Sequence, residues 1–302
     1  MSPKYLFMYF FLGGIIVMSI FGMQILPDIA IDQEKTFSVD EVDAIRVKLT
    51  TYPLHIIQTG AGEPIKIHLY GKASQEVSLV AAVNQKTVTT EVYYPYPMHG
   101  WNNLSMDIYL PADYEKDLSV DITTGKVTLD AMILRHFALQ STTGGVAADA
   151  ITAESVDVRA TTGGIRFKAL NSPEIKIKGS TGAIAVGTCA TQNAVIEGTT
   201  GDIRLEQCSG NFNLNTSTGS VSLDIVSFEN QNVQIKTTTG KINLQLPASA
   251  EFNLQANTTT GSIHSDYPIN TVSSHNVSGQ VGTGDNKITL KTTTGGISLQ
   301  KN

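Results

Sequence analysis

Residues 161–165 read Thr-Thr-Gly-Gly-Ile, and variants of this segment recur throughout the second half of the chain. The first five copies of the Thr/Ser-Thr-Gly triplet follow one another at strict intervals of 19 residues, and the next three intervals are 18, 21 and 21. A ninth copy closes the series after a longer insertion. The turn glycines of the triplets are Gly125, Gly144, Gly163, Gly182, Gly201, Gly219, Gly240, Gly261 and Gly295. Self-similarity at a short, nearly fixed period indicates a stack of similar structural units.

Apolar residues occupy fixed positions around each of these glycines. The positions seven and five before the glycine, and two and four after it, carry Val, Ile, Leu, Phe or Ala in every copy except at Ser265. A spacing of two is the period of a β-strand, in which alternate side chains share one face. Each repeat is therefore predicted to hold two short strands joined at the Thr-Gly turn, where glycine tolerates a positive φ.

The repeats are predicted to stack, because one unit alone cannot bury its apolar face. The predicted fold is all-β: a β-solenoid of nine stacked two-strand rungs over residues 118–302, with an insertion at about 265–286. An antiparallel meander, with each Thr-Gly as a hairpin turn, is the alternative that periodicity leaves open. Alternating segments such as 44–49 and 65–69 predict further strands, so residues 34–117 are interpreted as an irregular β cap on the solenoid.

The amino terminus predicts one transmembrane helix that precedes the solenoid. Tyr5–Leu26 is a run of 22 residues without a charge, which as a helix spans about 33 Å, enough for a bilayer core. Lys4 precedes this run and acidic residues follow it. The positive-inside rule then predicts a cytoplasmic amino terminus and an extracytoplasmic solenoid. Residues 1–27 are interpreted as a single-pass membrane anchor, and a cleaved signal peptide, whose apolar core is normally shorter, is the alternative.

Composition and outward positions give no indication of catalysis. A net charge of -6 gives no reason to expect a nucleic-acid partner. The outward columns three after and six before the glycine hold no carboxylate pair, His cluster or basic patch. We therefore assign no catalytic residue, cofactor or metal, and predict that the chain is not an enzyme. Acids recur five positions after the glycine, and a cation could bridge Asp130 and Asp149, but Lys168 and Gly187 interrupt the column, which favours a solvated strand end.

The two cysteines occupy equivalent positions in neighbouring repeats. Cys189 and Cys208 both stand seven residues after a turn glycine, so stacking would bring them to adjacent rungs, about 5 Å apart. That separation is within disulfide range, and an extracytoplasmic site would permit oxidation. We hypothesise a disulfide between them, and a pair of buried thiols is the alternative.

An aromatic segment precedes the repeats. Residues 93–101 read Tyr-Tyr-Pro-Tyr-Pro-Met-His-Gly-Trp and contain the only Trp of the chain. Exposed aromatic side chains can stack on sugars or anchor a protein partner, whereas the alternative is a packing plug over the end of the solenoid. The candidate partner- or glycan-binding residues are Tyr93, Tyr94, Tyr96, His99 and Trp101. A second contact is expected after Leu299, where the last rung would leave an open strand edge.

The repeats resemble those of a bacterial family that is provisionally named for adhesion and whose biochemical function is unknown. The Thr-Thr-Gly-Gly-Ile and Ser-Thr-Gly-Ala-Ile units carry the resemblance. Residues 278–295 resemble the family's carboxyl-terminal signature, and Ile108-Tyr109-Leu110-Pro111 resembles its lead into the repeats. The match covers roughly residues 40–302. The resemblance implies a β-solenoid outside a bacterial cell and implies no reaction.

These observations predict a membrane-anchored, extracytoplasmic scaffold for adhesion or interaction, without enzymatic activity. Its expected partners are the membrane and either an envelope protein or a surface glycan. One alternative function is regulatory, in which the solenoid senses envelope stress and acts through a membrane partner. A second alternative is a polysaccharide-active solenoid enzyme, which would need acids, bases or metal ligands clustered on adjacent rungs.

Overall fold

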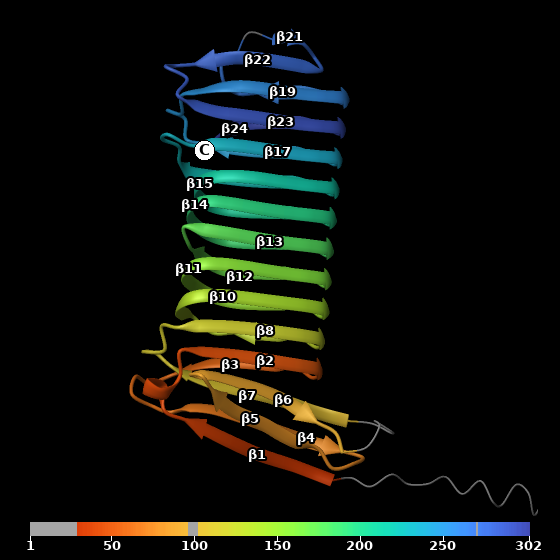
Figure 1. Ribbon diagram of the computed structural model, residues 1–302. Helices are drawn as coiled ribbons and strands as arrows, with labels where there is room; N and C mark the ends of the chain where they lie inside the picture. The colour runs from red at the N-terminus through yellow and green to blue at the C-terminus, as the bar shows by residue number, and fades with distance from the viewer. Residues whose placement is uncertain (1–28, 96–101, 270) are drawn as a thin grey trace, which may run out of the picture.

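The computed structural model describes residues 29–95, 102–269 and 271–302. This part of the chain is all-β, with 24 strands and one short 3-10 helix, η1 (Val39–Glu41). The strands stack into one elongated rod (Figure 1). No helix in these residues has the length and apolarity that crossing a membrane requires. The predicted anchor at residues 1–27 lies outside the described residues.

One side of the rod is a sheet built from the strands that precede the turn glycines. Its strands pair in parallel from β6 to β19 and antiparallel at the two ends. In spatial order this first sheet contains β5 (Ser78–Asn84), β6 (Thr87–Tyr93), β2 (Ala44–Thr51), β8 (Asp117–Thr124), β10 (Met132–Thr143), β11 (Val146–Thr162), β13 (Glu174–Thr181), β14 (Ile184–Thr200), β15 (Ile203–Thr218), β17 (Asn232–Thr239), β23 (Asn286–Thr294), β19 (Phe252–Thr260), β22 (Asn276–Val281) and β21 (Thr271–Ser273).

The other side is a second sheet, built mainly from the strands that follow the turn glycines. The longer strands β11, β14 and β15 contribute their first halves to it. Its remaining strands, in spatial order, are β1 (Ile29–Phe37), β4 (Ile65–Ala73), β7 (Asn102–Pro111), β3 (Leu54–Thr59) and β9 (Val127–Leu129), then β12 (Ile165–Asn171), β16 (Val221–Ser227), β18 (Ile242–Leu246), β24 (Ile297–Lys301) and β20 (Ile263–Ser265). The parallel ladders of both sheets exclude the antiparallel meander.

The core lies between the two sheets and is one continuous apolar cluster. The columns seven and five before the turn glycine, and two and four after it, supply its interior, as predicted. Every residue of these columns is buried except on the rung of β20, where Ile263 and Ser265 are half-buried. Because each rung shares its apolar face with the rungs above and below, the stack buries side chains that a single repeat would leave in water.

The last rung in sequence is not the last rung in space. β23 pairs in parallel with β17 on one side and with β19 on the other, and β24 lies between β18 and β20. The carboxyl terminus therefore lies part-way along the stack (Figure 1). The predicted open edge after Leu299 is wrong, because β24 has a partner strand on each side. The insertion makes this order possible, since β22 returns antiparallel along β19 at the far end of the rod before the chain enters β23.

A buried asparagine fixes the start of the inserted rung. Asn286 is buried at the beginning of β23. Its side-chain amide donates to the carbonyl oxygens of Phe228 and Glu251, at 3.1 and 2.7 Å, and its side-chain oxygen accepts from the Gln231 N–H at 2.7 Å. These bonds tie β23 to the segments that lead into β17 and β19.

The amino-terminal region contains one regular rung in addition to the predicted irregular cap. β2 and β3 stack directly on β8 and β9, with Thr51 opposite Thr124. Thr50 and Thr51 retain the threonine pair of the repeats, but Tyr52 occupies the place of the turn glycine. Strands β4 to β7 and β1 then close this end of the rod, largely by antiparallel pairing.

Candidate functional site

The turn glycines form a close-packed ladder along one edge of the rod. Their φ angles run from +131° at Gly163 to +153° at Gly240, a region in which side chains are strained. A Cβ at any of the nine positions would overlap a backbone carbonyl of the neighbouring rung. For Gly125 this is the carbonyl of Tyr52, and for each of the other eight it is the carbonyl of the turn glycine on that rung. Glycine is thus required for the turn conformation and for the spacing between rungs.

A column of buried hydroxyl groups supports this ladder on the later rungs. The third residue before the glycine is a buried threonine at Thr216, Thr237, Thr258 and Thr292. The hydroxyls of Thr237, Thr258 and Thr292 donate to turn-glycine carbonyls of neighbouring rungs at 3.0, 2.9 and 3.1 Å. This column was not predicted from the sequence, although the Thr-Thr-Thr-Gly segments on three rungs indicate it. Its role is structural, since it satisfies buried carbonyl groups.

Cys189 and Cys208 meet in register on β14 and β15 and form a disulfide, with their Cα atoms 4.5 Å apart. Both residues are buried. They continue an inward column of the second sheet that holds Ile151 and Leu170 on the preceding rungs. The disulfide therefore links two adjacent rungs through the core.

Removing this bond is expected to lower the free energy of unfolding. The two cysteines are 19 positions apart in the sequence, so loop-closure entropy gives a loss of about 3 kcal/mol for the double variant Cys189→Ala/Cys208→Ala. Urea unfolding with and without reductant measures this loss, and the double variant is the control, because reductant should not change its stability. An unchanged thiol count with and without reductant, under denaturing conditions, would contradict the bond.

Most of the acids five positions after the glycine form local contacts. Asp149 forms an ion pair with Lys168 at 2.6 Å, and Asp130 accepts a hydrogen bond from the Gln58 N–H at 3.1 Å. Asp224 accepts from the Asn302 side chain at 2.9 Å. Within the described residues no group of three or more His, Cys, Asp or Glu side chains is placed to hold a metal ion.

Only part of the aromatic segment lies within the described residues. Tyr93, at the end of β6, is 56% exposed, and Tyr94 is half-buried. Burial raises the pKa of the Tyr94 hydroxyl to about 12. Tyr96, His99 and Trp101 lie outside the described residues. A binding role for this segment stays a prediction.

A polar cluster in the amino-terminal region was not predicted from the sequence. Asp107 on β7 lies in register between His68 on β4 and His55 on β3, and the His55 imidazole is 2.9 Å from its carboxylate. The hydroxyls of Tyr70 and Tyr109 donate to the same carboxylate at 3.4 Å. Burial and the charge of Asp107 raise the pKa of both tyrosines. These residues come from three strands that precede the glycine-marked repeats, so no sequence period indicated that they would meet.

The outer face of the first sheet changes character along the rod. On β11, β13 and β14 it carries opposite charges that neutralise each other, as in the Asp157–Arg159 pair at 2.8 Å and the Lys178–Glu197 pair at 3.1 Å. On β15, β17, β23 and β19 the outward side chains are amides, hydroxyls and lysines, without a carboxylate. We call this second region the amide–lysine face. It consists of Asn211, Asn213, Asn215, Ser217, Asn232, Gln234, Lys236, Thr238, Lys287, Thr289, Lys291, Thr293, Asn253, Gln255, Asn257 and Thr259.

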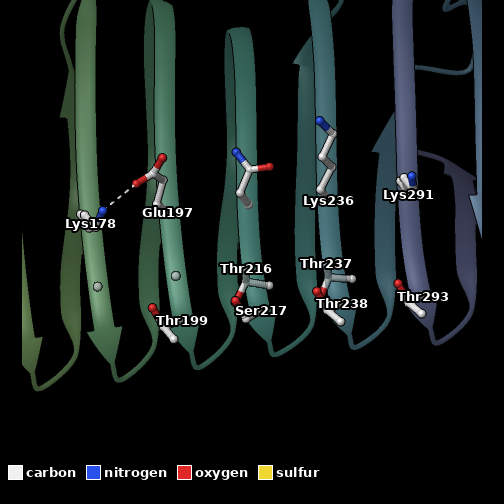
Figure 2. A pocket seen from close by; sticks show the side chains of 13 residues that line it. Lys178, Glu197, Thr199, Thr216, Ser217, Lys236, Thr237, Thr238, Lys291 and Thr293 are labelled. Atoms are coloured by element: carbon white, nitrogen blue, oxygen red, sulfur yellow. Dashed lines mark ion pairs between the residues drawn. The ribbon is translucent and has the colours of Figure 1, made fainter.

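Three open hollows lie over this face. One, of about 450 Å³, is lined by Lys236 and Lys291 and extends to the Lys178–Glu197 pair (Figure 2). Hydroxyl side chains near the turns also line it, those of Thr199, Ser217, Thr238 and Thr293. A second, of about 460 Å³, and a third, of about 560 Å³, share Lys287 and Thr289. Outward columns taken in sequence order do not reveal this face, because β23 takes its place between β17 and β19 only in the folded chain.

The chain is similar to several solved structures. A crystal structure from Parabacteroides merdae, provisionally described as an adhesin, is 11% identical and covers 90% of this chain and 96% of its own, with a TM-score of 0.47. One from Bacteroides fragilis with the same description is also 11% identical, covers 90% and 97%, and has a TM-score of 0.46. One from Clostridium sporogenes, provisionally described as a cell adhesion protein, is 15% identical, covers 91% and 100%, and has a TM-score of 0.27.

No curated protein matches the chain significantly. The family model described as Toastrack DUF4097 matches residues 42–300. This match spans all the repeats and the regular amino-terminal rung. The chain belongs to the Toastrack DUF4097 family.

Proposed function

We propose that this chain is a non-enzymatic interaction scaffold, anchored in the membrane by its amino-terminal segment and exposed outside the cytoplasm. The observation that carries the proposal is the amide–lysine face, on which four adjacent strands present a continuous polar surface. Sites for small molecules are usually concave and enclose their ligand, whereas broad open surfaces suit large partners. A stack of rungs with a continuous core holds such a surface in a fixed shape.

Two further features support the extracytoplasmic part of the proposal. Disulfides between core residues form and persist in oxidising compartments, and Cys189 and Cys208 form such a bond. The uncharged run Tyr5–Leu26 is long enough to span a bilayer as a helix. Acidic residues follow this run and Lys4 precedes it, which favours an exterior solenoid.

Labelling of intact cells tests the location. A membrane-impermeant amine reagent should modify exposed lysines of the solenoid, such as Lys176 and Lys236, in unbroken cells. A cytoplasmic protein of the same cells is the control and should stay unlabelled. Labelling of the solenoid only after lysis would contradict the proposed exposure.

Crosslinking in intact cells, followed by mass spectrometry, tests the scaffold function. Recovery of envelope material bound to the rod supports the proposal. Recurrent capture of one membrane signalling protein would instead favour the regulatory alternative. Turnover of a glycan by the purified chain would overturn the non-enzymatic assignment.

A further inference from the structure

We propose that the amide–lysine face binds an extended acidic polysaccharide. This inference rests on the proposed scaffold function and names the chemical class of its partner.

The charges on the face are all positive. Lys236 and Lys291 lie in register on the neighbouring strands β17 and β23. Lys287 lies four residues before Lys291 on the same strand β23 and borders a different hollow. None of the three forms an ion pair with another residue in the part of the chain that the structure describes, whereas Lys178, on the other half of the same sheet, is paired with Glu197. The nearest acids beside the face include Glu251, whose carboxylate accepts two bonds from Thr283, at 2.9 and 2.6 Å. Acids border the face, with Asp285 two residues before Lys287 and Glu197 in the hollow that Lys236 and Lys291 line. Glu197 is paired with Lys178, and the three ammonium groups form no ion pair with these acids, which favours an anionic partner.

The remaining groups suit the hydroxyls of sugars. An amide side chain both donates and accepts hydrogen bonds, as a sugar hydroxyl does. Some amides of the face are already engaged, since Asn215 donates to Asn213 at 2.9 Å and Asn211 donates to the Gln192 carbonyl at 2.7 Å. Gln234, Gln255 and Asn257 form no side-chain hydrogen bond with any other described residue, so their amides are available to a ligand.

The spacing of the lysines fits an extended polymer. In-register residues on neighbouring strands are about 4.8 Å apart, and residues four apart along a strand are roughly 13 Å apart. Lys236, Lys291 and Lys287 are therefore spread over the face. Lys287 borders the hollows of about 460 and 560 Å³, while Lys236 and Lys291 line the hollow of about 450 Å³. A chain of sugars that carries a negative charge at intervals can contact all three lysines, whereas a single small anion cannot.

The composition of the face disfavours other anionic partners. Proteins that bind single-stranded nucleic acids use aromatic side chains and arginines to stack on the bases, and the face has neither. In the described part of the chain the exposed large hydrophobic side chains are those of Val80, Val83, Tyr93, Ile133 and Val226, and none of them lies on this face. A lipid surface usually gains affinity from such side chains. An acidic polysaccharide needs neither.

Binding of the full-length chain to polygalacturonate, in detergent, tests the inference, with dextran as the neutral comparison. The wild type should bind polygalacturonate and not dextran, and its affinity should fall as salt is raised. Replacing Lys236, Lys287 and Lys291 together by Gln should weaken binding about tenfold. The matched control replaces Lys48, Lys126 and Lys176 by Gln, which removes the same charge from exposed positions outside the face and should change affinity by less than about twofold.

A variant that keeps the charge separates specific contacts from general attraction. Replacing Gln234 and Asn257 together by Ala should weaken binding about threefold while the melting temperature stays unchanged. Equal losses in the two lysine triples, or equal binding to dextran, would overturn the inference. If the wild type does not bind polygalacturonate, but crosslinking in intact cells still captures an envelope partner, this inference fails and the proposed function stands.

Discussion

The substitution Gly144→Ala is expected to destabilise the rod by about 3 kcal/mol or more, because it combines backbone strain with an overlap between rungs. Gly144 has a φ of +132°, and a Cβ there would overlap the carbonyl oxygen of Gly125 on the next rung. Neither group can move alone, since both belong to the ladder of turns. Urea unfolding of the purified chain, followed by circular dichroism, measures the loss.

The adjacent residue provides a matched control for this prediction. Gly145 lies in the same turn, and a Cβ there would be 3.4 Å from the Gly164 carbonyl oxygen, an ordinary contact. The equivalent position carries side chains on other rungs, such as Lys126, Ala183 and Asp202. Gly145→Ala should therefore change the free energy of unfolding by less than about 1 kcal/mol. Equal effects of the two substitutions would contradict the role assigned to the turn glycines.

Ending the chain after Asp285 is expected to release a segment that comes earlier in the sequence. This truncation removes β23 and β24, which separate β17 and β18 from β19 and β20. β19 then loses its parallel partner and is left with the antiparallel β22. The free energy that opposes local opening of residues 252–281 should fall to roughly zero, while the rungs up to β18 keep most of their protection.

Hydrogen exchange with peptide resolution measures the effect of the truncation. The full-length chain is the reference, and peptides from β10 to β14 are the internal control, because they lie several rungs away. If the rungs instead stacked in sequence order, the truncation would remove only the last rung, and residues 252–281 would stay protected. That outcome would contradict the order described here.

The regular part of the fold could be predicted from the sequence because each rung repeats the same local chemistry. The alternating columns placed residues such as Phe137 and Ile165 in the core, and the triplets placed the turns. The equivalent positions of Cys189 and Cys208 placed them on neighbouring rungs for the same reason. These inferences depend only on a strand period of two and on the repeat length.

The order of the last rungs could not be predicted in the same way. A ladder of equivalent residues looks the same whether β17 is followed by β19 or by β23, because both carry threonines before the glycine and apolar residues at the same offsets. What distinguishes the two orders is tertiary contact, above all the three bonds of Asn286 with Gln231, Phe228 and Glu251. The amide–lysine face could not be predicted for the same reason, since its two lysines on β23 lie beside Lys236 of β17 only in this order.

The contacts of the cap were equally inaccessible to sequence reasoning. Tyr52 replaces a turn glycine in the first regular rung, so the glycine pattern does not indicate that rung. Asp107 meets His55 and His68 through pairings between strands that are far apart in the sequence. Such contacts are fixed by register between distant strands, and no local pattern specifies that register.

Oxidation of engineered cysteine pairs tests the central claim, which is that the carboxyl-terminal rung lies inside the stack and completes the amide–lysine face. Lys291 is in register with Lys236 on β17 and with Asn257 on β19. Cα atoms of neighbouring strands lie about 4.8 Å apart and those two rungs apart about 9.6 Å, whereas a disulfide needs less than about 7 Å. The variant N257C/K291C is the positive control, because these residues are neighbours in either order.

Mild oxidation is expected to link the two cysteines of K236C/K291C and to leave those of K236C/N257C unlinked, as measured by mass spectrometry of peptides digested without reduction. A link in K236C/N257C, with none in K236C/K291C, would show that the rungs follow sequence order. That result would contradict both the inserted rung and the binding face that depends on it.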